Sequence, residues 1–228
     1  MAVDVLIFGA HPDDVEWAAG GIALLLRDQG ISFGVVDMTR GEMGSRGTVA
    51  ERDAEAAQAA EMMGAQAREN LALPDCGLVD LPEYRRAIAS AIRRHRPRIV
   101  LSPLWEDRHP DHAAAGLLVQ NARLLCGLST LEDSNPPHRP EAYLYYPIHT
   151  FHKPTFVVDT SAVYARKLEL MRVYDSQFGQ TNPADFLYRL ESRDRYYGSL
   201  IGAAHGEALV TDQPIAIDGL RPVLSLLR

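Results

Sequence analysis

The sequence has little of what would mark a secreted, membrane-spanning or nucleic-acid-binding protein. Two cysteines among 228 residues exclude a disulfide framework and favour a reducing, cytoplasmic location. No apolar run approaches the length that spans a bilayer, and the N-terminal residues show no basic region or cleavage site of a secretory signal. Only two of the 23 basic residues are lysines, and a formal net charge of −7 argues against nucleic acid as a main partner. We therefore expect neither a membrane nor a nucleic-acid partner.

The chain is long and apolar enough to bury a full hydrophobic core. Its 228 residues are 46% hydrophobic and 23% charged, which favours a single domain over residues 1–228. The polar, proline-containing connection at 128–140 is the one place where an internal boundary would fall. We find no internal repeat and no low-complexity tract in the sequence.

Short apolar segments typical of buried strands alternate along the chain with segments typical of helices. We expect strands at residues 3–8, 32–37, 70–73, 99–102, 142–146, 155–158 and 207–210. We expect helices at residues 16–27, 49–63, 82–94, 111–126, 161–174 and 184–201. Such alternation implies an α/β fold with a mostly parallel sheet and helices on both faces. The segments after residue 140 are predicted to form a small C-terminal αβ extension that completes the pocket.

An acidic turn directly follows the first predicted strand. It contains His11, Asp13, Asp14 and Glu16. Ligands bind at the carboxyl ends of strands in open α/β sheets, and a bound cation would relieve the repulsion between neighbouring carboxylates. Any one of these residues could instead be a solvated residue or complement a helix N-terminus. The turn therefore needs a partner before it can be counted as a site.

A second cluster of histidines and acids follows the predicted strand at 99–102. It spans residues 105–112 and contains His109, Asp111 and His112. Because the carboxyl ends of parallel strands share one edge of the sheet, the two turns can meet. Imidazole and carboxylate ligands suit zinc, and an open zinc site needs only three protein ligands. The surplus leaves candidates for a general base and an electrostatic stabiliser. Spacing alone does not say whether Asp13 or Asp14 binds the metal.

Four arginines are expected near the same edge of the sheet. Arg40 and Arg46 lie in the glycine-rich loop at 39–47, Arg52 lies one turn into the next predicted helix, and Arg108 belongs to the second cluster. The loop lacks the spacing of a nucleotide-binding fingerprint, which argues against a dinucleotide cofactor. Guanidinium groups favour an anionic substrate group, most naturally a carboxylate. The alternative is that some of them form surface pairs with nearby carboxylates, which contribute little to stability.

Two motifs carry a resemblance to a known family. The first is His-Pro-Asp-Asp-Val-Glu at 11–16, and the second is His-Pro-Asp-His at 109–112. Together they resemble the PIG-L / LmbE-like zinc deacetylases, and similar residues at 39–42, 70–71, 105–108, 176–178 and 196–202 extend the resemblance over most of the chain. Within the family, the sequence most resembles the bacillithiol-biosynthesis branch, the deacetylases of N-acetylglucosaminyl malate. It departs from relatives at 17–19, where they carry an aliphatic residue and often another glycine.

The resemblance implies a Rossmann-like α/β fold and an N-deacetylase. The expected reaction removes the acetyl group of N-acetylglucosaminyl malate in bacillithiol biosynthesis, giving glucosaminyl malate and acetate. One Zn²⁺ per subunit, or another divalent metal such as Fe²⁺, would be bound by His11, Asp14 and His112. Asp13 would be the general base. Family members form trimers or hexamers, so the resemblance also implies a homo-oligomer.

The resemblance assigns roles to the remaining candidates as well. His109, oriented by Asp111, would stabilise the oxyanion and assist the departing amine. Arg52 would hold the substrate, and Arg108 is a second candidate for binding the malate carboxylates. Residues 179–186 differ most among relatives, so contacts to the distal part of the substrate stay unassigned.

Two alternative functions remain open on the sequence. The substrate could be another N-acetylglucosamine (GlcNAc) conjugate, such as a mycothiol precursor, a chitooligosaccharide or an antibiotic intermediate. The chain could also be a non-catalytic zinc-binding or sugar-binding module. The presence of Asp13, His109 and Asp111 argues against a module, because a binding protein needs no general base.

Overall fold

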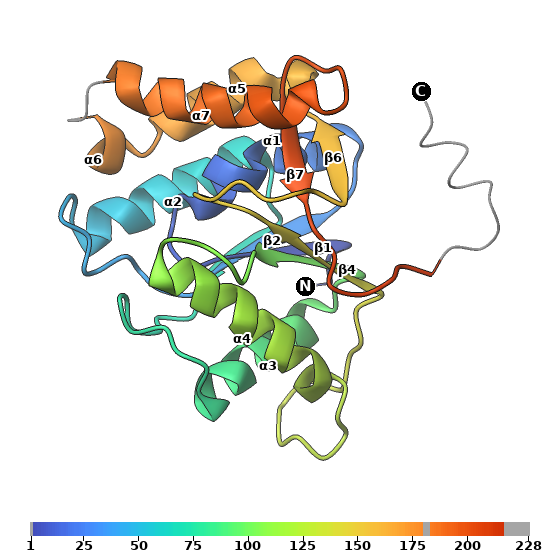
Figure 1. The fold of residues 1–228 in the computed structure, drawn as a ribbon. Coiled ribbons are helices and arrows are strands. Elements are labelled where there is room, and N and C mark those ends of the chain that lie inside the picture. Colours follow the sequence, from blue (N-terminus) through green and yellow to red (C-terminus); the bar gives the residue numbers. More distant parts are fainter. Residues whose placement is uncertain (1, 180–182, 217–228) are drawn as a thin grey trace.

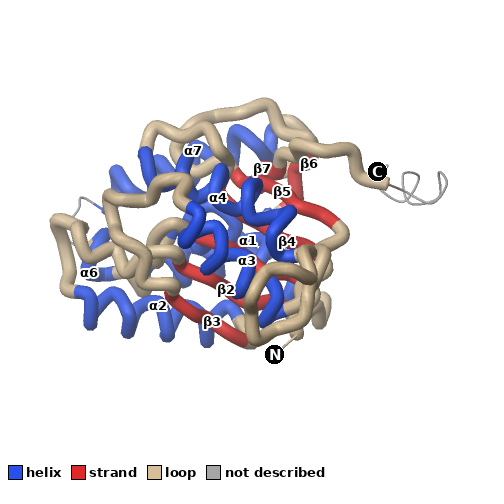
Figure 2. The backbone as a smooth tube through the Cα atoms, turned by 90° about the horizontal axis from the view of Figure 1, so that it is seen from below, coloured by secondary structure: helices blue, strands red, loops and turns tan. Residues whose placement is uncertain are grey.

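The centre of the molecule is a parallel β-sheet. The computed structural model describes residues 2–179 and 183–216, and the side chains of all of these except 183–185. Five parallel strands pair in the order β3-β2-β1-β4-β5 (Figures 1 and 2). They are β1 (Val5–Gly9), β2 (Phe33–Asp37), β3 (Ala67–Asn70), β4 (Ile99–Pro103) and β5 (Ala142–Tyr146). The strand order reverses at β1, so the carboxyl ends of β1 and β4 lie side by side, where a ligand site is expected.

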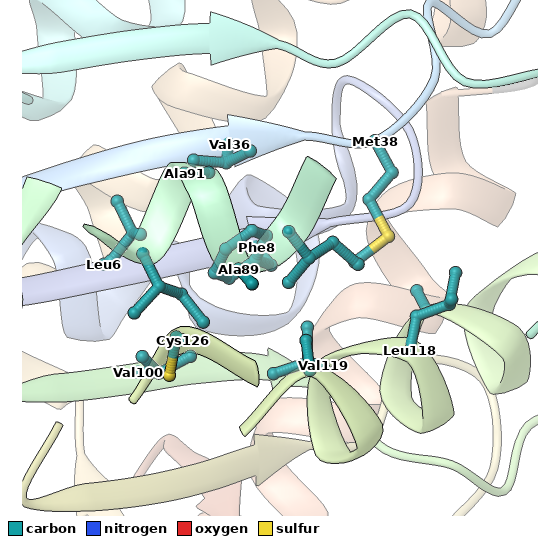
Figure 3. Close-up of a cluster of buried hydrophobic side chains, with 14 of the residues drawn as sticks. Leu6, Phe8, Val36, Met38, Ala89, Ala91, Val100, Leu118, Val119 and Cys126 are labelled. Atoms are coloured by element: carbon teal, nitrogen blue, oxygen red, sulfur yellow. The ribbon is translucent and has the colours of Figure 1, made fainter. Parts of the chain in front are cut away.

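Helices cover both faces of this sheet, as predicted. Helices α1 (Asp14–Asp28) and α2 (Val49–Met63) pack on one face, and α3 (Pro82–His95) and α4 (Pro110–Cys126) pack on the other (Figure 1). Strands β1, β2, β4 and β5 contribute alternate side chains to two separate hydrophobic cores, because successive residues of a strand point to opposite faces. In the core beneath α3 and α4, Phe8 and Val100 of the sheet pack with Met38, Val119 and Cys126 (Figure 3).

The C-terminal part forms the predicted αβ extension. It contains β6 (Phe156–Asp159), a short 3₁₀ turn (Ser161–Val163), α5 (Tyr164–Arg172), α6 (Asp175–Phe178), α7 (Pro183–Ser199) and β7 (Gly206–Leu209). Strands β6 and β7 form a two-stranded antiparallel sheet of their own. Helix α5 packs against α1, and α7 packs against β7 (Figure 1). Among the described residues, no helix combines the length and the apolar composition that crossing a bilayer requires.

Two predicted elements differ from those observed. The strand expected at 70–73 lies earlier, at Ala67–Asn70, because the Asn70 side chain accepts a hydrogen bond from the backbone N–H of Ala72 and turns the chain. Leu73 still enters the core, but from a loop. The helix expected at 161–174 is a 3₁₀ turn followed by α5, which ends at Arg172, and the short α6 begins at Asp175.

The connection at 128–140, where a boundary was considered, is tied to α3. The buried guanidinium of Arg93 donates hydrogen bonds to the carbonyl groups of Leu125, Cys126, Leu128 and Leu131. A single arginine thus satisfies the last carbonyls of α4 and the start of the connection, which have no intrahelical partners. That the whole chain is one domain stays a prediction.

A buried ionic cluster joins the extension to α1. Lys167 Nζ lies 2.6 Å from carboxylate oxygens of both Asp194 and Glu207, and all three side chains are fully buried. The carboxylate of Glu207 also accepts hydrogen bonds from the backbone N–H groups of Gly21 (2.8 Å) and Ile22 (2.7 Å) in α1. A side chain at position 21 would meet this carboxylate, since a Cβ there would lie 2.9 Å from Glu207 Oε1. Glycine therefore permits the close approach of β7 to α1.

Replacing Lys167 with methionine should destabilise the fold by about 3–5 kcal/mol, because Glu207 would be left buried without its cation and Asp194 would keep only its pair with Arg193. Urea unfolding monitored by circular dichroism would measure the loss. Arg166→Met is the matched control, since Arg166 is the neighbouring residue of α5 and forms an exposed pair with Asp28. Equal stability losses in the two variants would contradict the structural role of the buried cluster.

Candidate metal centre and active site

The turn between β1 and α1 is closed by the side chain of Asp14. Its Oδ2 accepts hydrogen bonds from the backbone N–H groups of Ala10 and His11, both at 2.9 Å. These bonds hold the carboxylate in the turn and aim its other oxygen across the sheet edge. Oδ1 lies 3.1 Å from Nε2 of His112, at the start of α4. The two turns predicted to meet do so through this pair.

His11 and His112 each have an acidic partner on the ring nitrogen that faces away from Asp14. Nε2 of His11 lies 3.1 Å from Asp75 Oδ1, while its Nδ1 lies 3.5 Å from Asp14 Oδ2. Nδ1 of His112 lies 3.2 Å from Asp107 Oδ1, while its Nε2 faces Asp14. Carboxylates that bind the outer nitrogen of a metal-ligating histidine fix its tautomer and orientation. Both rings can therefore direct a lone pair toward the same point.

His11, Asp14 and His112 form a group with the geometry of a metal site. One ligand atom from each lies within 4.8 Å of the others, and all three residues are buried. Two imidazole nitrogens and a carboxylate oxygen suit Zn²⁺, and three protein ligands leave a position open, as in catalytic zinc sites. The donor set therefore fits the predicted metal.

The electrostatics of this group favour a cation between its members. Burial opposes protonation of His11, but hydrogen bonds to Asp111, Asp14 and Asp75 raise its pKa to about 12. Burial likewise opposes the shift in His112, but the charge of Asp14 and its acidic hydrogen-bond partners raise the pKa to about 9. Both rings thus hold protons when no metal is bound, and a divalent cation would supply the same positive charge.

Asp13 sits at the N-cap of α1 in an unusual backbone conformation. Its φ of 112° lies in the left-handed region, which is strained for a residue other than glycine. Its carboxylate makes no capping hydrogen bond to the helix, although aspartate is a favoured capping residue. Instead it lies 3.4 Å from Nη2 of Arg52 and faces the cavity. Burial raises the pKa of Asp13 to about 7, even though Arg52 opposes this shift.

His109 is the N-cap of α4 and its ring lies over that of His112. Its Nδ1 accepts a hydrogen bond from the backbone N–H of Asp111 at 3.2 Å, and the His109 and His112 ring centroids are 4.5 Å apart. Burial, together with the charges of His112 and His11, lowers the pKa of His109. The ring is therefore neutral near pH 7, with its hydrogen on Nε2, and this N–H is available as a donor.

Asp111, which was predicted to orient His109, contacts its ring through the backbone. The backbone N–H of Asp111, not its carboxylate, contacts His109. The carboxylate of Asp111 accepts hydrogen bonds from the backbone N–H groups of Cys76 (2.7 Å) and Leu78 (3.3 Å), and it lies 3.4 Å from His11 Nε2. The Asp111 carboxylate is thus bound mainly by backbone N–H groups of the loop after β3. These bonds hold that loop against the two turns.

The metal group, Asp13 and His109 border one cavity of about 750 Å³. Such a volume lies within the roughly 300–1,000 Å³ of pockets that bury drug-sized ligands. His11, Asp13, Asp14, His109 and His112 line it at the sheet edge. Residues of the C-terminal extension close its other side, including Phe178 of α6 and Phe186 of α7. The extension therefore completes the pocket, as predicted.

Comparison with known proteins places the chain in a family. The model of the PIG-L family, described as GlcNAc-PI de-N-acetylase, matches residues 6–123, just over half of the chain. This chain belongs to the PIG-L family. The matched segment holds both histidine-containing motifs and runs from β1 into α4. Membership confirms the predicted family and the prediction that the chain is an enzyme.

The relatives of this PIG-L family member match different shares of its chain. The diacetylchitobiose deacetylase of Thermococcus kodakarensis is 33% identical over 90% of this chain and 81% of its own length. The probable N-acetyl-alpha-D-glucosaminyl L-malate deacetylase 2 of Bacillus cereus is 34% identical over 54% of this chain and 61% of its own. The solved structure of conserved protein TT1542 from Thermus thermophilus has a TM-score of 0.88 and 39% identity, covering 95% of this chain and 97% of that one. This match confirms the predicted α/β fold.

The four arginines predicted at the site of this PIG-L protein have different surroundings. Arg40 pairs with Asp53 at the surface and does not line the cavity. Arg46 lines it, but donates a hydrogen bond to the carbonyl of Gln177. Arg52 is buried, and its guanidinium donates to the carbonyls of Pro12 (2.6 Å) and Gly41 (3.1 Å). Arg108 is exposed at the cavity and has no polar partner among the described residues.

Three residues of the site were not assigned roles from the sequence. Asp75 follows β3 in a loop with no recognisable pattern, and its carboxylate contacts His11. Asp107 stands within the second cluster and supports His112. His149 follows β5, and its ring lies 5.0 Å from that of His112. Burial and the charge of His112 lower the pKa of His149 to about 4, so its ring is neutral. The clue available for His149 was its position, since it too follows a parallel strand.

Glu16, the other acid of the first turn, points away from the metal group. Its carboxylate accepts a hydrogen bond from the Tyr174 hydroxyl at 2.8 Å and pairs with the guanidinium of Arg68. Arg68 also binds Asp37 at the end of β2. Glu16 thus holds the beginning of α1 against β2 and β3, beneath the turn that carries Asp13.

Replacing Asp107 with asparagine should weaken metal binding about 10- to 100-fold, because its carboxylate orients His112 and accepts backbone hydrogen bonds from His109 and His149. Competition with a chromophoric chelator would measure the affinity. Glu106→Gln is the matched control, since this neighbouring carboxylate is exposed. An affinity unchanged from wild type would remove Asp107 from the support of the metal centre.

Proposed function

We propose that this chain is a metal-dependent N-deacetylase of GlcNAc conjugates, with Zn²⁺ held by His11, Asp14 and His112. The observation that carries the proposal is the placement of these three donors, a carboxylate free of capping bonds and a neutral histidine N–H donor on one cavity. The named deacetylases among its relatives support the same reaction. A cytoplasmic location and a homo-oligomer of three or six subunits stay predictions.

The chain's own residues divide the work of amide hydrolysis. A bound Zn²⁺ would supply Lewis acidity, lowering the pKa of water and polarising the acetamide carbonyl. Asp13 takes a proton from the attacking water, since its pKa near 7 suits a base at neutral pH. The Nε2–H of His109 donates to the oxygen that becomes negative when the carbonyl carbon turns tetrahedral. Asp13 returns the proton to the nitrogen as the C–N bond breaks, releasing the amine and acetate.

Arg52 assists in a way that differs from its predicted role in substrate binding. Its guanidinium spans the carbonyls of Pro12 and Gly41, and its charge lies beside Asp13. We assign Arg52 to positioning Asp13 and holding the glycine-rich loop over the cavity. Arg108, which lines the cavity, is then the better candidate for direct contact with a polar group of the substrate.

A substrate panel combined with metal analysis tests the proposal. The zinc-loaded protein should release free amine and acetate from at least one of N-acetylglucosaminyl malate, diacetylchitobiose and N-acetylglucosamine. N-acetylglucosaminyl malate is the substrate predicted from the sequence, and diacetylchitobiose represents the chitooligosaccharide alternative. A zinc-loaded protein that binds these sugars without releasing amine would establish the non-catalytic module instead.

A further inference from the structure

An aromatic wall forms one side of the cavity and has no part in the proposed chemistry. We define the aromatic wall as Trp17 of α1, Phe178 of α6 and Phe186 of α7. The rings of Phe178 and Phe186 stack at a centroid distance of 3.9 Å and an interplanar angle of 20°. The Trp17 ring continues the surface, 5.2 Å from that of Phe186. All three residues line the cavity and are half-buried.

The aromatic wall begins next to the metal group. Trp17 lies three residues after Asp14 on α1, so the two side chains share one side of the helix. The indole Nε1 donates a hydrogen bond to the carbonyl of Ile148 at 3.4 Å, and the adjacent His149 packs against the His112 ring. This bond fixes the orientation of Trp17. When the acetamide of a substrate lies at the metal group, the part of the substrate next to the acetamide would therefore contact the aromatic wall.

Polar groups border the same space. Arg46, Arg108, Arg189 and Gln177 line the cavity together with the aromatic wall. Arg108 and Arg189 are exposed and have no hydrogen-bond or ion-pair partner among the residues that the structure describes. A sugar ring matches this lining, because a pyranose presents a flat face of C–H groups and a rim of hydroxyls. An alkyl chain would match a closed apolar pocket better, and a small open-chain acid would leave the aromatic surface exposed to water.

We propose that the aromatic wall is a specificity subsite that stacks on a second sugar ring joined to the GlcNAc residue undergoing deacetylation. The inference rests on the proposed deacetylase function and narrows its substrate to a GlcNAc disaccharide or longer oligosaccharide. Trp17 and Phe186 supply the stacking surface. Arg108 and Arg189 reach the hydroxyl groups of the same ring.

Steady-state kinetics on two substrates test this subsite. The wild-type kcat/KM for diacetylchitobiose should exceed that for N-acetylglucosamine by about 10-fold or more, the scale of one lost aromatic contact. Trp17→Ala and Phe186→Ala should each lower kcat/KM for the disaccharide about 10-fold and change that for the monosaccharide less than about 2-fold. Trp17→Phe, which keeps a ring, should retain most of the preference. Tyr188→Ala is the matched control, since Tyr188 lies on α7 two residues from Phe186 but is 71% exposed and outside the cavity.

Four outcomes would overturn the subsite while leaving the deacetylase intact, and three of them are kinetic results on the substrates named above. They are equal wild-type kcat/KM for the two sugars, equal losses on both sugars in the Trp17→Ala and Phe186→Ala variants, and a higher kcat/KM for N-acetylglucosaminyl malate than for the disaccharide. The fourth outcome concerns a GlcNAc derivative with a longer N-acyl chain. If its turnover depends on Trp17 more strongly than turnover of the disaccharide does, the aromatic wall binds the acyl group instead of a second sugar.

A binding measurement separates failure of the subsite from failure of the proposed function. In a Trp105→Phe variant, Trp17 is the remaining tryptophan, so its fluorescence reports on the aromatic wall. Chitobiose, the disaccharide with neither acetyl group, should quench this fluorescence, and glucosamine should do so about 10-fold more weakly. Quenching without any deacetylation would refute the proposed function and support sugar binding at the aromatic wall. Deacetylation with equal quenching by the two sugars would refute the subsite alone.

Discussion

The Asp13→Asn variant should retain its metal and lose about 10²- to 10⁴-fold in kcat, the usual contribution of a positioned general base. An amide has nearly the same size and can still receive the Arg52 guanidinium, but it cannot accept the proton of the attacking water. Because Asp13 is not among the group that could hold the metal, the bound metal per chain should stay at the wild-type value. Metal analysis and single-turnover amine release on the same sample would measure both effects.

The pH dependence of this variant gives an independent test. The wild-type kcat/KM should fall as the pH decreases through the pKa of Asp13, which burial raises to about 7, because only the carboxylate can act as base. The residual activity of Asp13→Asn should lose this acidic limb. Glu42→Gln serves as the control, since Glu42 is an exposed carboxylate on the glycine-rich loop and does not line the cavity. Full turnover by a metal-loaded Asp13→Asn protein would exclude Asp13 as the base.

The sequence pattern predicts the central sheet, because its middle strands are buried and their apolar residues follow one another in short runs. All five residues of β1 and of β2 are buried, and both appear as apolar runs between helices, although the run in β2 ends at the buried Asp37. The prediction was wrong at β3, whose four residues are only half-buried and mostly polar. The apolar residues that follow, among them Leu73, reach the core from a loop. An apolar run indicates burial, and it indicates a strand only where the backbone also pairs.

The choice of the three metal ligands rested on the family resemblance. The expectation that their two turns meet depended on one topological argument, namely that parallel strands bring their carboxyl ends to one edge. The topological argument does not predict the contact between Asp75 and His11, because that contact depends on how the loop after β3 folds back. Nor does a motif specify side-chain conformation. Asp111 stands two residues from His109, yet the backbone N–H makes the contact and the carboxylate turns to Cys76 and Leu78. For Arg52, spacing placed a guanidinium near the edge, and only the structure shows it enclosed by carbonyl groups.

Removing the metal should abolish activity and lower the melting temperature by an amount that depends on the metal concentration. At a free Zn²⁺ concentration about 1,000 times Kd, binding to the folded chain alone would add about 4 kcal/mol, or about 8–16 °C for a chain of this size. The physical basis is that His11, Asp14 and His112 come from two turns that meet only in the folded protein. Thermal unfolding of chelated and zinc-restored protein would measure the shift, and the same samples would be assayed for amine release.

Variants distinguish this site from incidental metal binding. Asp14→Asn should lose both the Zn²⁺-dependent rise in melting temperature and activity, whereas Asp13→Asn should keep the rise and lose activity. His138→Gln should behave as wild type, since its ring binds the carbonyl of Pro97. The apparent affinity for Zn²⁺ should also increase with pH, because the metal must displace protons from the imidazoles of His11 and His112. Their acidic partners hold the pKa of His11 at about 12 and that of His112 at about 9. A rise in melting temperature that survives in Asp14→Asn would place the metal elsewhere and separate the cavity from metal-dependent chemistry.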